Sequence, residues 1–381
     1  MASASVVGVG MIPFGKHPDR MLVDLGSEAA YMALKDAGLN PKHVEIGFFA
    51  NGFAGRLFGD FTIGQNVFWN VGINRIPVVN VENACTSGST AFYLAYNAVA
   101  AGQVGVALAV GAEKLYVPEL GLLNSGQTEL DTQLGRVAPA SFALRAIRYM
   151  EEFGATPEQL AQVSVKNRRH SGLNPLSQFR DPITVEEVLE APMVVDPLTR
   201  LMCCPNADGA AAVVVASPDI ARRQGRAVNI DAAVLATGNY ENPQDQLRWE
   251  TDYRACRVAY EKAGIGPEDI DLAECHDAFT ICEIIHYEAM GLCPTGEGAR
   301  FAAKGETELG GRIPVNTSGG LLSRGHPVGA TGLAQIYEIV TQLRHEAGER
   351  QVEGAKAGLA HCMGGDKEGD TKSCTVAIFS V

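Results

Sequence analysis

The feature that most constrains the fold is an internal repeat. The stretch ALKDAGLNPKHVEIGFFANGF, residues 33–53, matches AYEKAGIGPEDIDLAECHDAF, residues 259–279, at a constant offset of 226 residues without a gap. Each copy has the apolar spacing of an amphipathic helix, then a turn at Gly38 or Gly264, a proline and a short apolar stretch that suits a strand. The repeat predicts two similar halves that pack against each other.

A second shared feature follows each copy of the repeat. Residues 76–99, IPVVNVENACTSGSTAFYLAYNAV, run from an apolar strand through a turn of small residues into an apolar helix. Residues 313–340, IPVNTSGGLLSRGHPVGATGLAQIYEIV, have the same order of features. Strands that alternate with helices predict a pseudo-symmetric α/β protein whose sheets are covered by helices.

The stretch between the halves has no counterpart in the second half and is rich in prolines and polar turns. We interpret it as an inserted loop domain, residues 115–201. The remaining boundaries follow: an N-terminal half of residues 1–114 plus 202–220, and a C-terminal half of residues 221–381. The first half resumes after the insertion with a small-residue apolar run that suits a buried strand.

The composition is that of a globular protein with a large core: 381 residues, 46% hydrophobic, 20% charged and a net charge of −13. No Lys/Arg cluster is present that would bind phosphates or anionic lipid, so nucleic acid and membrane surfaces are not expected partners. The sequence shows neither a signal peptide nor an apolar stretch of transmembrane length, which favours a cytoplasmic location.

Cys85 is the first candidate for chemistry. The nine cysteines include no C-x-x-C pair, so neither a disulfide framework nor a metal site is predicted, and most are expected to be buried in the core. Cys85, in VENACTSGST, lies between a predicted strand and a predicted helix, where the helix N-terminus favours a thiolate and lowers the thiol pKa. Cys85 is either a nucleophile or one of the core cysteines.

His326 is the second candidate, in SRGHPVGATG. Flanking glycines and a proline before a predicted helix fix the direction of its imidazole. The pseudo-symmetry places this turn at the position equivalent to the Cys85 turn, so an approximate two-fold axis would bring thiol and imidazole face to face, as a cysteine nucleophile requires. The alternative is a histidine that only caps the helix.

Two further motifs end predicted strands. His276, in ECHDAF, is placed to donate a hydrogen bond to a developing oxyanion, or else lies on the surface. Cys362, in AHCMGGD, is placed to exchange protons, and Gly364 to present a backbone N–H to a ligand; the alternative is a buried thiol. His286 is interpreted as an ordinary helix residue, and His361 receives no role.

Together, and in this order across nearly the whole chain, the four motifs resemble those of the thiolase superfamily. The matching segments are CTSG with Cys85, HDAF with His276, GHPVGATG with His326 and CMG with Cys362. HDAF, with MIPFG near the start and PLTRLMCCPNADGAAA, resembles the sterol-carrier-protein-type branch. The sequence stops at Val381, so we expect no sterol-carrier domain.

The resemblance implies a role for each residue. Cys85 attacks an acyl-CoA thioester and holds the acyl group covalently, and His326 activates Cys85 and donates to a thioester oxygen. His276 completes that oxyanion hole, and Cys362 removes or returns the α-proton of a second acyl-CoA. The backbone N–H groups of Cys85 and Gly364 form a second oxyanion hole.

The resemblance also implies the architecture and the activity. It implies a five-layered αβαβα fold and a homodimer or homotetramer. The activity is that of an acyl-CoA C-acyltransferase that makes or cleaves 3-oxoacyl-CoA, with CoA and acyl-CoA as substrates and no permanently bound cofactor. Two alternatives stay open: a retro-aldol lyase, and a subunit of a multiprotein acyltransferase that acts with an OB-fold/zinc-ribbon partner.

One segment departs from the family pattern. A charged insert, Asp366 to Asp370, replaces the expected glycine-rich turn after CMGG. We expect it to alter access to the site or to contact a partner, and it leaves the role of Cys362 open.

Overall fold

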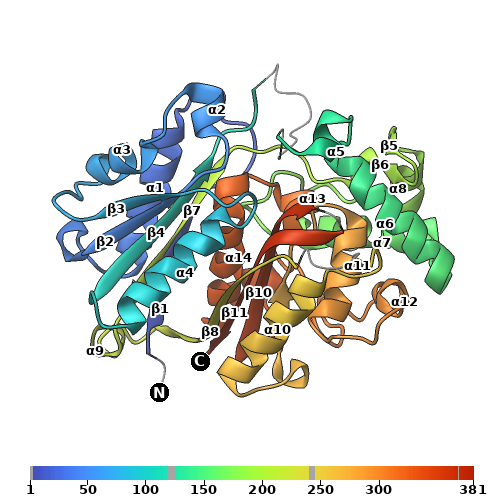
Figure 1. Ribbon diagram of the computed structural model, residues 1–381. Helices are drawn as coiled ribbons and strands as arrows, with labels where there is room; N and C mark the ends of the chain where they lie inside the picture. Colours follow the sequence, from blue (N-terminus) through green and yellow to red (C-terminus); the bar gives the residue numbers. More distant parts are fainter. Residues whose placement is uncertain (1–2, 118–125, 127, 240–244, 368) are drawn as a thin grey trace.

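The computed structural model describes residues 3–117, 126, 128–239, 245–367 and 369–381 (Figure 1). In chain order, with η for a 3₁₀ helix, its elements form a first half, an intervening segment and a second half. The first half contains β1 (Ser5–Met11), α1 (Leu22–Asp36), η1 (Pro41–His43), β2 (Ile46–Ala50), α2 (Ala54–Phe58), α3 (Ile63–Asn70), β3 (Val78–Val81), α4 (Ser87–Ala100), β4 (Val106–Glu113) and β7 (Gly209–Ala216). Between β4 and β7 lie α5 (Leu130–Gln133), α6 (Ala138–Phe153), α7 (Pro157–Gly172), α8 (Val185–Glu190), β5 (Met193–Val195), β6 (Leu198–Thr199) and η2 (Arg200–Met202). Helix α9 (Pro218–Ala221) follows β7 and packs on β1 of the first half. The second half contains β8 (Val228–Thr237), α10 (Glu250–Ala263), η3 (Pro267–Asp269), β9 (Leu272–Glu274), α11 (Thr280–Ala289), α12 (Gly298–Ala303), α13 (Gly320–Arg324), α14 (Val328–Leu343), η4 (Gly348–Arg350), β10 (Ala357–Lys367) and β11 (Asp370–Ser380).

The repeat appears in the structure as two half-sheets of the same topology. The strand order is β3-β2-β4-β7-β1-β8-β11-β10-β9, and β1 meets β8 only at two residue pairs, so the halves join along a short seam. Val315 forms a parallel bridge with Ala273 of β9, at the place that β3 takes beside β2. Gly38 and Gly264, at the equivalent helix ends, both have left-handed φ values (62° and 72°), as the two Ala-Gly turns predicted.

The layers follow from the alternation of side chains along the strands. In β4, Leu108 and Val110 pack with the buried face of α1, whereas Ala107 and Ala109 pack with α4 and α14. In β11, Val376 and the other outward residues pack with α10 and α11. Helices α4 and α14 therefore form a central layer between the half-sheets, with α1 and α10 outside (Figure 1). The predicted five-layered α/β fold is confirmed.

The two central helices approach each other closely because glycines line their contact. A Cβ on Gly88 would lie 2.7 Å from the carbonyl oxygen of Gly329, and a Cβ on Gly332 would lie 2.6 Å from the Cβ of Ser89. Larger residues would push the helices apart. Because α4 follows the Cys85 turn and α14 follows His326, this contact brings the two turns together.

The segment between β4 and β7 rests on the second half. Helix α7 packs on α11, α12 and α13. Buried Lys166 forms an ion pair with Glu283, and the Asn167 side chain donates to a carboxylate oxygen of Asp277 at 2.8 Å. The boundaries 1–114 plus 202–220, 115–201 and 221–381 stay a prediction, and residues 118–125 and 127 of the loop domain lie outside the described part.

The charged segment Asp366 to Asp370 forms the end of the β10–β11 hairpin, of which residue 368 lies outside the described residues. The Asp366 carboxylate accepts hydrogen bonds from Arg136 and Arg145, each at 3.2 Å. The hairpin that carries Cys362 is thereby joined to the segment between β4 and β7.

Among the described residues, no helix combines the length and the apolar character needed to cross a membrane.

Candidate active site

Cys85 lies in a tight turn between β3 and α4. Ala84 has φ 48°, a left-handed conformation that costs a non-glycine residue about 1 kcal/mol. The Ser87 hydroxyl holds this conformation, because it accepts a hydrogen bond from the Asn83 N–H at 2.8 Å and donates one to the Ala84 carbonyl at 2.6 Å. A strained turn thus presents the thiol just before the helix.

His326 lies between α13 and α14 and faces this thiol. Its Nε2 is 3.4 Å from the Sγ of Cys85, and its Nδ1 is 2.7 Å from the Oγ1 of Thr331. Thr331 donates its own hydroxyl hydrogen to the Pro327 carbonyl at 3.0 Å, so its oxygen accepts the Nδ1–H of the imidazole. This arrangement leaves the Nε2 lone pair directed at the Cys85 thiol, which is the tautomer a base requires.

Both members of this pair are neutral at neutral pH. Burial raises the pKa of Cys85 to about 12, and the negative charge of Glu113 adds to the rise. Burial lowers the pKa of His326 to about 3, with a further contribution from the positive charge of Arg324. The expectation that the helix start lowers the Cys85 pKa was wrong, because burial outweighs the helix N-terminus.

His276 follows β9 and is 3% exposed. Its ring lies edge-on to that of His326, with centroids 5.3 Å apart, and neither of its nitrogens has a hydrogen-bond partner among the described residues. A ligand atom from each of Cys85, His276 and His326 lies within 4.8 Å of the other two. The His276 nitrogens are thus free to bind an oxygen of a ligand near the sulfur.

Cys362 points to the same place from β10. Its Sγ donates to the Cys85 carbonyl at 3.2 Å, and burial raises its pKa well above the ordinary value. Alternation along β10 directs Cys362 toward the central layer and Leu359 and Met363 toward the outer helices.

The glycines after Cys362 differ in position. Gly364 lies against the Cys85 turn, where an added Cβ would be 2.8 Å from Thr86 Oγ1 and 3.0 Å from the Asn83 carbonyl. The Gly365 backbone N–H faces the thiol and opposes the rise of the Cys85 pKa. Gly365 has φ 71°, which favours glycine, but the motif CMG did not indicate its contact with the thiol.

Glu113, at the end of β4, fixes the start of α14. Its buried carboxylate accepts hydrogen bonds from the N–H groups of Gly52 at 2.8 Å, Phe53 at 3.2 Å and Gly329 at 3.0 Å. Burial raises the Glu113 pKa to about 7, against the lowering effect of these donors. This one carboxylate links the first half to the helix that follows His326.

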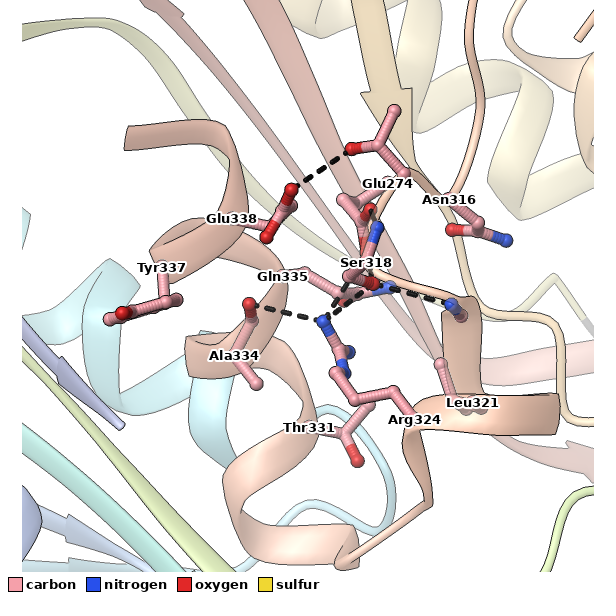
Figure 2. A network of polar contacts seen from close by, with 12 residues as sticks. Glu274, Asn316, Ser318, Leu321, Arg324, Thr331, Ala334, Gln335, Tyr337 and Glu338 are labelled. Atoms are coloured by element: carbon pink, nitrogen blue, oxygen red, sulfur yellow. Dashed lines mark hydrogen bonds and ion pairs between the residues drawn. The ribbon is translucent and has the colours of Figure 1, made fainter. Parts of the chain in front are cut away.

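A buried ion pair connects the two histidine loops. Arg324 Nη1 lies 3.3 Å from a carboxylate oxygen of Glu274 and donates to the Ser318 hydroxyl at 2.9 Å. Figure 2 shows Arg324 reaching from α13 toward the end of β9, beside α14. Glu274 precedes His276 by two residues and Arg324 precedes His326 by two, so the pair sets the relative position of the imidazoles.

Asp277 adds a second connection between these loops. Its carboxylate accepts hydrogen bonds from the backbone N–H groups of Leu321 at 2.7 Å and Leu322 at 3.2 Å, in α13. Burial and the charge of Glu283 raise the Asp277 pKa to about 8.

The structure brings the side chains of Cys85, His276, His326 and Cys362 into one site and places Gly364 beside it. Their roles stay predictions. The motif GHPVGATG contains Thr331, yet nothing in the sequence indicated its contact with His326. The sequence did not indicate the contacts of Glu113 either, because its partners lie far away along the chain.

The comparisons with known proteins agree with this geometry. Residues 4–219 match the family model described as the thiolase N-terminal domain, and residues 235–378 match the one described as thiolase C-terminal domain-like. The chain is 40% identical over 371 residues to an acetyl-CoA acetyltransferase of Methanothermobacter thermautotrophicus, covering 96% of this chain and 97% of that protein. It is 39% identical over 368 residues to the benzoylsuccinyl-CoA thiolase subunit BbsB of Thauera aromatica, covering 94% of each. It is also 39% identical over 383 residues to human sterol carrier protein 2, covering 94% of this chain and 69% of that protein.

Solved structures show the same fold. The Ltp2-ChsH2(DUF35) aldolase matches with a TM-score of 0.82 and 28% identity, covering 98% of this chain and 97% of that one. Human mitochondrial 3-ketoacyl-CoA thiolase in complex with CoA matches with a TM-score of 0.73 and 19% identity, covering 99% and 98%. The chain belongs to the thiolase family. It is an enzyme, and the predicted acyltransferase class is confirmed.

The tautomer of His326 gives a prediction. Thr331→Val removes the acceptor of Nδ1–H without changing the side-chain volume, so we expect acylation of Cys85 by acetyl-CoA to slow by about 10-fold to 100-fold. Single-turnover mass spectrometry measures this rate. Thr341→Val on the same helix is the matched control, because Thr341 donates to the Tyr337 carbonyl away from the site. Equal rates in both variants would contradict the assignment.

Proposed function

We propose that the protein is an acyl-CoA C-acyltransferase that makes or cleaves 3-oxoacyl-CoA through an acyl group on Cys85. The observation that carries the proposal is the meeting of Cys85, the His326 lone pair and Cys362 within one buried site. The relatives named for acetyl-CoA acetyltransferase and benzoylsuccinyl-CoA thiolase activity support CoA thioesters as substrates.

In the first step, Cys85 sulfur attacks the thioester carbonyl of an acyl-CoA while its proton passes to Nε2 of His326. Both groups start neutral, so sulfur deprotonates as the bond forms. The N–H groups of Cys85 and Gly364, joined by that of Gly365, stabilise the oxyanion. The C–S bond to CoA then breaks, and CoA leaves as the thiol with the proton of Cys362.

In the second step, the Cys362 thiolate takes the α-proton of a second acyl-CoA. His326, now protonated, and His276 donate hydrogen bonds to the enolate oxygen, for which the unpartnered nitrogens of His276 are suited. The enolate carbon attacks the acyl group on Cys85, a C–C bond forms, and the Cys85 thiolate leaves and regains the proton from His326. The three groups end in their starting states, and the reverse sequence cleaves 3-oxoacyl-CoA.

The second candidate function is retro-aldol cleavage within a complex that contains an OB-fold/zinc-ribbon partner. Its support is the similarity to the Ltp2-ChsH2(DUF35) aldolase, together with a relative named as a thiolase subunit. The presence of both cysteines and the Cys85–His326 contact favours acyl transfer, because retro-aldol chemistry has no need of a sulfur nucleophile.

The chain also has a surface suited to a second copy of itself. In the described part of the chain, β3 ends the sheet, and Val79 is exposed on it. Phe61 and Trp69 beside it are 77% and 73% exposed. An open strand edge flanked by large apolar side chains favours pairing with another strand, so we place the homodimer contact here.

Intact-protein mass spectrometry after incubation with acetyl-CoA tests the main proposal. We expect one acetyl group on the wild type and none on Cys85→Ala. The matched control Cys256→Ala, at a buried cysteine of α10, acquires the acetyl group as the wild type does. Turnover that survives Cys85→Ala would instead support the lyase.

Sedimentation velocity tests the dimer contact. Trp69→Glu places a charge beside β3 and shifts the protein toward monomer. Leu144→Glu, at an exposed residue of α6, leaves the dimer intact. A monomeric wild type, or equal effects of the two variants, would contradict the placement.

A further inference from the structure

A second group of buried polar side chains lies behind the candidate active site. Asp252 of α10, His286 of α11 and His361 of β10 are fully buried, and a polar atom from each lies within 4.8 Å of the other two. The mechanism proposed above uses none of them. Helix α10 packs on β11 and contacts α11, so the group lies between the outer helices and the sheet (Figure 1).

The three side chains are ordered by specific contacts. His361 Nε2 lies 2.7 Å from the Oδ1 of Asp252. The His286 ring lies against the His361 ring, with centroids 4.3 Å apart, and it also stacks on the Trp249 indole at 5.1 Å and 29°. His286 thus contacts two rings.

The geometry is that of a hydrogen-bonded group rather than of a metal site. Two ligands of a tetrahedral zinc ion lie about 3.3 Å apart, because each bond is about 2.0 Å long. The distance of 2.7 Å from His361 to Asp252 is shorter and fits a hydrogen bond between an imidazole and a carboxylate.

The group lies next to the backbone of His276 and of Cys362, the two residues assigned to the enolate step. Burial lowers the pKa of His286, and the charges of His361 and His276 lower it further. The backbone carbonyl of His276 faces the His286 ring and opposes this fall. His361 is the residue before Cys362, and alternation along β10 turns its side chain outward while Cys362 points to Cys85. One group therefore contacts the His276 loop on one side and the Cys362 strand on the other.

Burying these polar side chains lowers the stability of the protein, which is expected only where they contribute to function. Asp252 Oδ2, His361 Nδ1 and both nitrogens of His286 have no hydrogen-bond partner of normal geometry among the described residues. Buried polar atoms of this kind lower stability relative to apolar side chains of the same shape.

We propose that Asp252, His361 and His286 are positioning residues that hold His276 and Cys362 in register for formation of the enolate. The inference rests on the proposed acyltransfer mechanism. Acylation of Cys85 depends on His326 and on backbone N–H groups, and it uses Cys362 only for the proton that the departing CoA takes up. The enolate step instead requires both Cys362 and His276 in position. Damage to the group therefore slows the enolate step far more than acylation.

The experiment separates these two steps in the full-length protein. Acylation of Cys85 is followed by intact mass, and enolate formation by exchange of the acetyl-CoA methyl protons in deuterated water, observed by NMR. His286→Phe keeps the ring stack and removes the nitrogens, and Asp252→Asn keeps the shape and removes the charge. In both variants we expect acylation to stay within about 3-fold of wild type and α-proton exchange to fall by about 10-fold to 100-fold.

The control is His170→Gln, at a buried histidine outside this group whose nitrogens contact the Asn316 carbonyl at 3.0 Å and the Leu309 N–H at 3.1 Å. We expect it to lower the melting temperature without changing the ratio of the two rates. Equal loss of both rates in His286→Phe and Asp252→Asn, no loss of either, or failure of both variants to fold would overturn the inference. Absence of acylation in the wild type would instead reject the proposed function.

Discussion

The close contact between α4 and α14 is the constraint on which the site depends. Glycines at 88 and 332 let the two helices approach closely, because a side chain at either position would clash with the other helix, and this approach brings together the turns that precede them. The Cys85 turn comes from the first half and His326 from the second, 241 residues later, yet Sγ and Nε2 lie 3.4 Å apart. The internal repeat thus explains the site as well as the fold: each half supplies one of two equivalent turns.

Burial decides the electrostatics of this site. The Cys85 pKa is raised to about 12 and the His326 pKa is lowered to about 3, so the pair rests as thiol and imidazole. Each unit of pKa shift corresponds to about 1.4 kcal/mol, so the thiolate–imidazolium pair has a higher free energy than the neutral pair before a substrate binds. The Gly365 N–H faces the thiol and opposes the rise of its pKa, and in the proposed mechanism charge develops beside this group only as the sulfur attacks.

Features carried by local sequence could be predicted, and features made by distant contacts could not. The repeat gave the two halves because helix, turn and strand are encoded within some twenty residues, and the glycines of GHPVGATG marked His326. Glu113 could not be recognised, because its partner Gly329 lies 216 residues away. The direction of the Cys85 pKa shift was mistaken for the same reason: a helix start is visible in the sequence, whereas the protein that surrounds the thiol is not. The Asp252–His361 contact likewise joins residues 109 positions apart.

The central claim is that the His326 imidazole is neutral, with its proton on Nδ1 and its lone pair on Cys85. Nitrogen-15 NMR of histidine-labelled protein measures this directly, with His326→Asn used to assign the signal. The account predicts one protonated nitrogen, Nδ1, and one unprotonated nitrogen, Nε2, with no titration from about pH 8 down to about pH 5, because the lowered pKa keeps the ring uncharged throughout. Two protonated nitrogens at about pH 8 would show a thiolate–imidazolium pair, and titration near the ordinary value of about 6.5 would show that burial does not lower the His326 pKa; either result would contradict the account.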